Sequence, residues 1–384
     1  MVMGEILKKI DALGGIIIEA GIKYTSKLVL LSIVLATVGC DHQNDIDVKM
    51  DIAESLMNSK PDSALAVLDG IPVSDVKGKE TSARYALLKS MALDKNYIDT
   101  TTFDILQPAI DYYIEHGTPN ERLRTYYYQG RIYQNQGDDD SAMQSFMNGC
   151  DLRESITDSL LLAHTLVAQG TLYLKQYKTG EFIHNNEEAA KLYGAIGKEV
   201  LEIKSYTKAL DGYVMMNNKS MADSILSICM PLAQKNPEGE AYLFPSFLSY
   251  TVELGSSDDI KIFLDEYQDL ELTKDETLNF AQGYSKIGEY DKALNFISKI
   301  TPSKFTLDSI KYTLVKTDIL EKQGRYEEAL GLYKDYSVML ERYQKELISQ
   351  DLLFSDKKHQ LEMKNLTEIR DKDRIIGLTL CSIF

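Results

Sequence analysis

The sequence predicts an all-α protein built from repeated pairs of helices, and three observations support this prediction. The first is a recurring pattern: Tyr126, Gly130 and Tyr133 share one helical face, Gly137 breaks the helix, and Ala142 begins a second apolar face. The second is that no stretch keeps the alternation of apolar and polar residues that a half-buried strand shows. The third is that only 8 of the 384 residues are proline, so few helices are interrupted.

The same order of residues returns in residues 281–297 and 317–333, with the second small residue always twelve positions after the first. This pattern resembles the tetratricopeptide repeat (TPR), a unit of about 34 residues made of two antiparallel helices. The resemblance implies a right-handed superhelical solenoid of TPR-like helix pairs, whose first helices line a concave groove. It also implies a binding surface rather than a catalyst.

Four helices are expected before the clearest repeat. Pro61 opens the second of them and Gly70 ends it, while Pro108 kinks or opens the fourth. These four helices are expected at about residues 52–57, 61–69, 81–95 and 103–116.

After the repeat at residues 123–150, the next pair is expected to start near Ala163. Its second helix arrives late, so residues 178–186 are predicted to be a loop extension. A degenerate pair around Leu210 and Leu226, a weaker pair at 244–254 and 260–267, and two clear repeats at about 274–336 follow. The predicted solenoid therefore covers residues 48–336.

Residues 337–374 contain no helix breaker and predict one long C-terminal helix. Leu340 and Leu347 begin a seven-residue recurrence, but polar residues occupy the partner row of the heptad. A dimeric coiled coil and a capping helix or stalk therefore both stay open. Residues 375–384 are apolar and about half as long as a bilayer span requires. They predict the start of a truncated transmembrane segment, with a short apolar tail as the alternative.

The N-terminal segment predicts an export signal. Lys23 and Lys27 precede the apolar run 28–38, which Gly39 and Cys40 follow. A cysteine directly after glycine resembles the lipobox of bacterial lipoproteins, which implies that Cys40 is lipidated and becomes the first mature residue. A buried helix or a simple membrane anchor is the alternative.

Two further boundaries follow from this signal. Residues 1–22 do not fit the start of a signal, so the start site is expected to be misassigned and residues 1–40 are left out of the fold. Residues 41–47 are polar and predict a short tether.

The composition argues against several classes of function. The formal net charge of −16 repels phosphate, so nucleic-acid binding by this chain is not expected. The cysteines form no CxxC pair, and the five histidines show no metal-ligand spacing. We therefore expect no metal and no cofactor. No P-loop, GxSxG or serine–histidine–aspartate order is present, so an enzyme is not expected.

Residues 51–71 and 86–99 resemble a large group of bacterial envelope proteins with a lipoprotein-type signal, TPR repeats, a long helix and a transmembrane helix. Some members continue into a cytoplasmic helix-turn-helix regulator, which this sequence is expected to lack. The resemblance implies a membrane-anchored, non-catalytic adaptor or sensor on the periplasmic face or outer membrane. The alternatives are a truncated signal transducer or transcriptional regulator, and an outer-membrane assembly or nutrient-capture lipoprotein.

The resemblance also implies where a protein or peptide ligand would bind, because the first helix of each pair faces the groove. Arginine and tyrosine there can hold a carboxylate or stack on a peptide. The candidates are Arg124, Tyr127, Arg131, Gln134, Asn135, Thr171 and Lys175, with His164, Val167, Lys311, Asp318 and Lys322 as further groove positions. The alternative is that these are ordinary solvated polar residues. The acidic run Asp138–Asp140 is predicted to cap a helix rather than to bind calcium.

Overall fold

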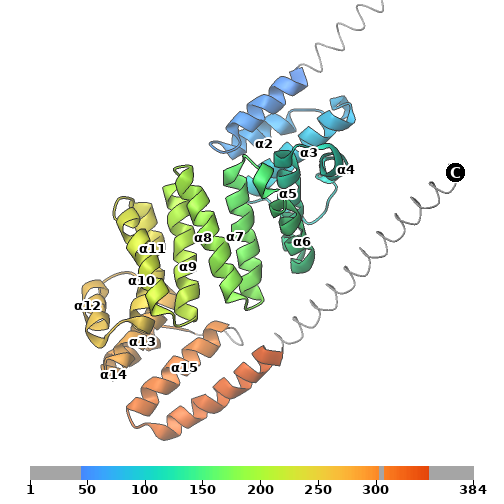
Figure 1. Ribbon diagram of the computed structural model, residues 1–384. Helices are drawn as coiled ribbons and strands as arrows, with labels where there is room; N and C mark the ends of the chain where they lie inside the picture. The colour runs from blue at the N-terminus through green and yellow to red at the C-terminus, as the bar shows by residue number, and fades with distance from the viewer. Residues whose placement is uncertain (1–44, 302–306, 346–384) are drawn as a thin grey trace, which may run out of the picture. The chain divides into compact units, whose positions relative to one another are not determined.

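The computed structural model describes residues 45–301 and 307–345, and all regular structure within these ranges is helical (Figure 1). The chain divides into two compact units at Gln136 and Gly137. Each unit is a succession of packed helices, so the predicted all-α class is confirmed.

The first unit begins with a helix at residues 45–56, which lies partly within the segment 41–47 predicted to be a tether. Ile46 and Met50 on this helix are buried in the core, so apolar packing orders the chain earlier than its polar surroundings suggest. The helices that follow are α2 (Pro61–Asp69), η1 (Val73–Asp75), α3 (Lys79–Lys95), α4 (Gln107–His116) and α5 (Pro119–Gln136).

The core of the first unit gathers around α3, which packs against α2, α4 and α5. Pro61 lies in the first turn of α2 and Pro108 in the first turn of α4, where a proline lacks no hydrogen bond that the helix needs. Pro108 therefore opens α4 instead of kinking a longer helix. The backbone turns away at Gly117, which ends α4 as predicted.

The second unit continues with successive helix pairs. Its helices are α6 (Asp139–Cys150), η2 (Arg153–Ser155), α7 (Ser159–Lys175), α8 (Thr179–Ala195), α9 (Glu199–Met215), α10 (Lys219–Ala233), α11 (Pro237–Leu254), α12 (Ser257–Tyr267), α13 (Lys274–Lys286), α14 (Tyr290–Ser298), α15 (Leu307–Lys322) and a helix at 326–345. Figure 1 shows α7, α8 and α9 side by side, and they pack extensively. We call α7, α9, α11, α13 and α15 the first helices of their pairs.

The predicted loop at residues 178–186 is wrong, because α8 is one continuous helix from Thr179 to Ala195. Phe182 and Ile183 are buried against α9, and a side chain at Gly212 would collide with Ile183. The Asn186 amide donates to the Phe182 carbonyl oxygen at 2.8 Å. The loop prediction rested on the late arrival of the second apolar face, but burial of Phe182 and Ile183 begins the helix earlier than Ala189 suggests.

The turns within the helix pairs share one backbone feature. Gly137, Gly288 and Gly324 have φ angles of 77°, 83° and 77°, in the left-handed region that glycine adopts without strain. The predicted helix break at Gly137 is thereby explained. Tyr177 and Asn217 adopt φ angles of 57° and 53° at corresponding turns, which shows that the geometry of the pair imposes the conformation.

The helix at residues 326–345 runs without a break through residue 336, where the sequence suggested that the solenoid ends. The second helix of the last pair and the described part of the long C-terminal helix are therefore one element. The Tyr343 hydroxyl lies 2.6 Å from that of Tyr177. The signal segment with Cys40 and the predicted transmembrane start lie outside the described residues. Among the described helices, none combines the length and the apolar character needed to cross a bilayer.

Candidate functional site

In the first unit, the predicted groove arginines bind carboxylates of neighbouring helices. The Arg124 guanidinium lies 3.0 Å from the Glu54 carboxylate, which also binds Arg84 at 2.9 Å. Arg131 donates to Asp94 at 3.0 Å through Nε. These arginines therefore fasten one helix pair to the next, whatever else they bind.

The other candidates of the first unit are also held within it. Gln134 accepts a hydrogen bond from Arg131 at 3.0 Å, and the Asn135 amide donates to the Thr100 carbonyl oxygen at 3.1 Å. Tyr127 packs against the core, and burial raises the pKa of its hydroxyl to about 12. These side chains of α5 thus lie where α5 meets α3 and the loop that follows α3.

In the second unit, Lys175 lies 2.9 Å from Asp139, so it joins α7 to the start of α6. Thr171 is exposed, and its hydroxyl donates to the Val167 carbonyl oxygen within the same helix. The His164 ring nitrogen Nδ1 lies 2.7 Å from the Tyr193 hydroxyl. Of these candidates, Thr171 is the one that stays at the surface with a bond only to its own helix.

The last pair repeats this arrangement. The Lys311 ammonium donates to the Asn279 side-chain oxygen at 2.9 Å. Asp318 accepts a hydrogen bond from Ser285 at 3.0 Å and pairs with Lys322 at 2.9 Å. The predicted groove positions therefore connect first helices α13 and α15.

Several of these bonds join residues that are 33 to 37 positions apart in the sequence. Arg131 and Asp94 are 37 residues apart, Lys175 and Asp139 are 36 apart, and Ser285 and Asp318 are 33 apart. A separation near the length of the repeat joins one helix pair to the next. We call these contacts between neighbouring helix pairs the polar ladder. They bind several of the side chains that the sequence analysis proposed as ligand contacts.

A different polar cluster lies between first helices α9 and α11, which pack against each other. Lys204, Lys208 and Asp211 follow one another along α9 at separations of four and three residues, so they share one face. The Lys204 ammonium lies 3.7 Å from the centroid of the Tyr242 ring on α11. It is 3.9 Å from a carboxylate oxygen of Glu238 on the same helix.

Two charges of this α9–α11 cluster are held at an energetic cost. Burial raises the pKa of the Asp211 carboxyl to about 6, while the Ser246 hydroxyl and the Lys208 charge oppose the rise. Burial lowers the pKa of the Lys208 ammonium, and Asp211 opposes that shift through its charge. The attraction between the two groups does not offset their loss of water. Perturbed groups of this kind gather at binding and catalytic sites more often than elsewhere.

The sequence analysis did not single out these residues. Its groove positions came from the best-matching repeats, whereas α9 belongs to a pair that was interpreted as degenerate. The available signal was the run of charged residues on one face of a helix whose other faces are apolar. Ile203, Ala209 and Leu210 occupy those apolar faces and are buried.

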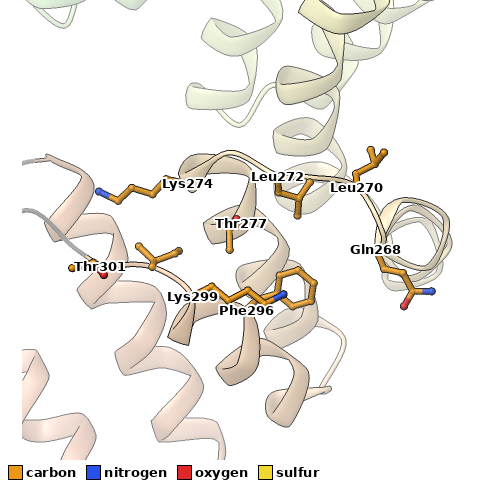
Figure 2. A pocket seen from close by; sticks show the side chains of 9 residues that line it. Gln268, Leu270, Leu272, Lys274, Thr277, Phe296, Lys299 and Thr301 are labelled. Carbon is orange, nitrogen blue, oxygen red and sulfur yellow. The ribbon is translucent and has the colours of Figure 1, made fainter.

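A pocket of about 410 Å³ lies beside α13, between the loop that follows α12 and the end of α14 (Figure 2). Leu272 and Thr277 lie at its centre in this view, and Lys274 and Lys299 bring two ammonium groups. The Lys299 ammonium lies 4.1 Å from the centroid of the Phe296 ring. The nine lining residues include no carboxylate, so this pocket is suited to an anionic group with an apolar neighbour.

The described residues offer little else for chemistry. Within them, no group of three or more histidine, cysteine, aspartate or glutamate side chains could hold a metal ion. Burial raises the pKa of the Cys150 and Cys229 thiols to about 12, so both stay protonated and act as small apolar groups. The Asp138 side chain accepts a hydrogen bond from the Ser141 amide at 3.2 Å, which confirms the predicted cap.

No protein-family model matches the sequence, and no curated protein matches it. Solved structures do resemble it. A Rap protein complexed with Competence and Sporulation Factor has a TM-score of 0.50 and 13% identity, covering 80% of this chain and 99% of its own. The apo form of RapI has a TM-score of 0.52 and 12% identity, covering 85% of this chain and 98% of its own. The likeness confirms the predicted TPR-like solenoid and shows the fold alone.

Proposed function

We propose that the chain is a non-catalytic adaptor or sensor that binds a protein or peptide along its first helices, centred on the α9–α11 cluster. One observation carries this proposal. Lys208 and Asp211 are partly buried charges on a first helix, and burial shifts both pKa values toward the neutral forms. Charges kept in this way at a cost to stability are expected where a ligand uses them.

The cluster offers the two kinds of group that a peptide backbone needs. An ionised Asp211 accepts hydrogen bonds from amide N–H groups, and Lys208 donates to carbonyl oxygens. Tyr242, a residue that is 44% exposed, adds an aromatic ring that already lies against Lys204. Because these groups have lost part of their hydration in the free protein, binding costs them less further desolvation.

The similar Rap structure is a complex with Competence and Sporulation Factor, so this kind of fold has held a bound factor in another protein. That supports a binding role for the present chain without naming its ligand. The earlier groove candidates remain proposed contacts, each within its own unit. Charge reversal at Arg131 or Lys175 is expected to act mainly through the lost ion pairs with Asp94 and Asp139.

Site-specific photo-crosslinking in cells tests this proposal. A photoreactive phenylalanine replaces Tyr242 on α11 or, as the control, Ile228 on the second helix α10; these residues are 44% and 42% exposed. We expect one specific adduct from position 242 that is absent from position 228 and is lost when Lys208→Glu is added. Equal adducts at both positions, or an adduct unaffected by Lys208→Glu, would contradict the proposal.

We also propose that lipidation of Cys40 tethers the binding unit to the membrane of the bacterial cell envelope. The support is the sequence of residues 23–40, with basic residues, an apolar run and a cysteine after glycine. Cys40→Ala is expected to move the protein from the membrane fraction to the soluble fraction, with the position-242 adduct unchanged. Equal membrane retention of both forms would refute the lipid tether and leave the binding proposal standing.

A further inference from the structure

A second pocket, of about 320 Å³, lies between α11 and α12 and is separate from the α9–α11 cluster. Its lining residues are Phe247, Tyr250, Thr251, Gly255, Asp259, Ile262, Phe263, Glu266 and Tyr267. Two features set it apart from the pocket beside α13. Its walls are mainly aromatic, and its ionisable side chains other than tyrosine are both carboxylates.

The aromatic rings form a continuous wall. The Phe263 centroid lies 4.7 Å from that of Tyr267 and 5.5 Å from that of Phe247. Phe247 is stacked on Tyr250 at 6.2 Å with an interplanar angle of 12°. Ring faces carry partial negative charge, and they attract a cation that lies over them.

This part of the molecule already places one cation on an aromatic ring. The Lys219 ammonium lies 4.9 Å from the Tyr250 centroid and donates to the Tyr250 hydroxyl at 2.8 Å. Lys219 is also 3.6 Å from Asp223. The chain therefore uses the same combination, a ring and a carboxylate, to hold a basic side chain of its own.

One carboxylate of the pocket, that of Asp259, is held in place by hydrogen bonds. The Ser256 hydroxyl and backbone amide donate to Asp259 at 2.7 and 3.0 Å, and these bonds lower the pKa of the Asp259 carboxyl. The capping box that they form holds this carboxylate at the start of α12. Glu266 lies two turns further along the same helix, so both negative groups line one side of the pocket.

We infer that this pocket binds an arginine side chain of a protein partner. A guanidinium group is planar, so it can stack on the Tyr267 ring, which is only partly buried, while it donates to Glu266 on the same helix. Asp259, two turns earlier on α12, adds negative charge to the same side of the pocket. A lysine ammonium can contact a ring and a carboxylate, as Lys219 does, but it is not planar and cannot stack face to face on a ring. The net charge of −16 attracts a basic segment toward the chain. The inference rests on the proposed function, because it specifies the chemistry of the protein that binds.

The test uses the full chain and small probes whose chemistry is known. Binding of N-acetyl-arginine-methylamide is measured by saturation-transfer NMR, beside the citrulline and lysine derivatives. Citrulline has the shape of arginine without its charge. We expect saturable binding of the arginine probe, weaker binding of the lysine probe and none of the citrulline probe.

Three variants locate the binding. Glu266→Gln is expected to weaken arginine binding roughly tenfold, the effect of losing one charged contact. Tyr267→Leu removes a ring without changing charge and is expected to weaken it severalfold. Glu327→Gln, at an exposed carboxylate of the helix 326–345, is the matched control and is expected to change nothing. Thermal unfolding of each variant shows whether it is folded.

The result that overturns the inference is equal binding of the arginine and citrulline probes, equal binding of the arginine and lysine probes, or arginine binding that both pocket variants leave unchanged. Its failure is distinguishable from that of the proposed function. The crosslink from position 242 would persist if only the arginine pocket is wrong. That crosslink would be absent, with arginine binding intact, if only the α9–α11 site is wrong.

Discussion

Charged side chains of the first unit and of the α9–α11 cluster in the second unit are held in opposite ways. In residues 45–136, Arg124 and Arg84 share the carboxylate of Glu54, and Arg131 binds Asp94. In the second unit, Lys208 and Asp211 are partly buried without a contact that compensates for the lost water. The first arrangement stabilises the stacking of helix pairs, and the second reduces stability.

This difference separates structural from functional candidates in a repeat protein. A charge whose partner lies about one repeat away in sequence belongs to the ladder between pairs, as Arg131 and Asp94 do at 37 residues. Asp211 also has a partner about one repeat away, the Ser246 hydroxyl, but this contact does not offset the effect of burial on its carboxyl. A buried charge whose contacts leave it with such a cost is a better candidate for a ligand contact than position on the first helix alone indicates.

The largest expected effect tests whether the second unit depends on its apolar core rather than on ion pairs. Tyr284 is 1% exposed and packs against Phe280 and Phe296, which are stacked on each other. Tyr284→Ala is expected to lower the free energy of unfolding by roughly 3 to 5 kcal/mol, because it leaves a large cavity. Urea denaturation followed by circular dichroism measures the loss.

Tyr284→Phe is the matched control, because it keeps the ring and removes only the hydroxyl. Its cost is expected to stay below about 1.5 kcal/mol. If the phenylalanine variant were as unstable as the alanine variant, the hydroxyl rather than the ring would hold this core together.

The fold was largely predictable because its signals are local. The glycines of the turns are visible in the sequence, and Gly137, Gly288 and Gly324 adopt the left-handed conformation for which they were read as breaks. The turns at Tyr177 and Asn217 carry no such signal. The missed part of α8 depends on packing against Gly212 of α9, a contact between residues about 30 positions apart that no local pattern encodes.

The candidate site was less predictable for the same reason. Whether a polar side chain is tied down depends on what the neighbouring repeat places opposite it. Arg124 and Glu54 are 70 residues apart, so the sequence around Arg124 does not indicate that the two form an ion pair. The burial of Asp211 likewise results from packing between α9 and α11. Reasoning from a single repeat therefore proposes candidate side chains but cannot show which of them a neighbouring pair already binds.

The next prediction sharpens the comparison at Asp211. The pKa of this carboxyl is about 6 in the folded protein, above its ordinary value of 3.8, so the folded state binds the proton more tightly. Protonation of Asp211 therefore stabilises the folded state relative to the unfolded state, and this stabilisation is lost as pH rises from about 4 to about 6. Asp211→Asn removes this loss, and is expected to stabilise the protein by about 2 kcal/mol at pH 7 and by little below pH 4.

Thermal unfolding at a series of pH values measures this difference. Asp269→Asn removes an exposed carboxylate in the same unit and serves as the control, with no such pH-dependent gain expected. Asp211→Asn is also expected to reduce partner crosslinking while it raises stability. A variant that is destabilised at pH 7 would mean that Asp211 belongs to a stabilising ladder after all, and the difference between the two units would disappear.

The smallest expected effect tests the other half of the comparison. Glu54 binds both Arg84 and Arg124, and its side chain is 39% exposed. Because water and salt screen a half-exposed network, Glu54→Gln is expected to lower the free energy of unfolding by only about 1 kcal/mol. The difference from the unsubstituted protein should shrink in 1 M NaCl, where ionic screening is strong. Asp62→Asn, at an exposed position of α2, is the control. A loss that persists in high salt would show that Glu54 acts through packing or neutral hydrogen bonds. Its ion pairs with Arg84 and Arg124 would then not be what stabilises the first unit.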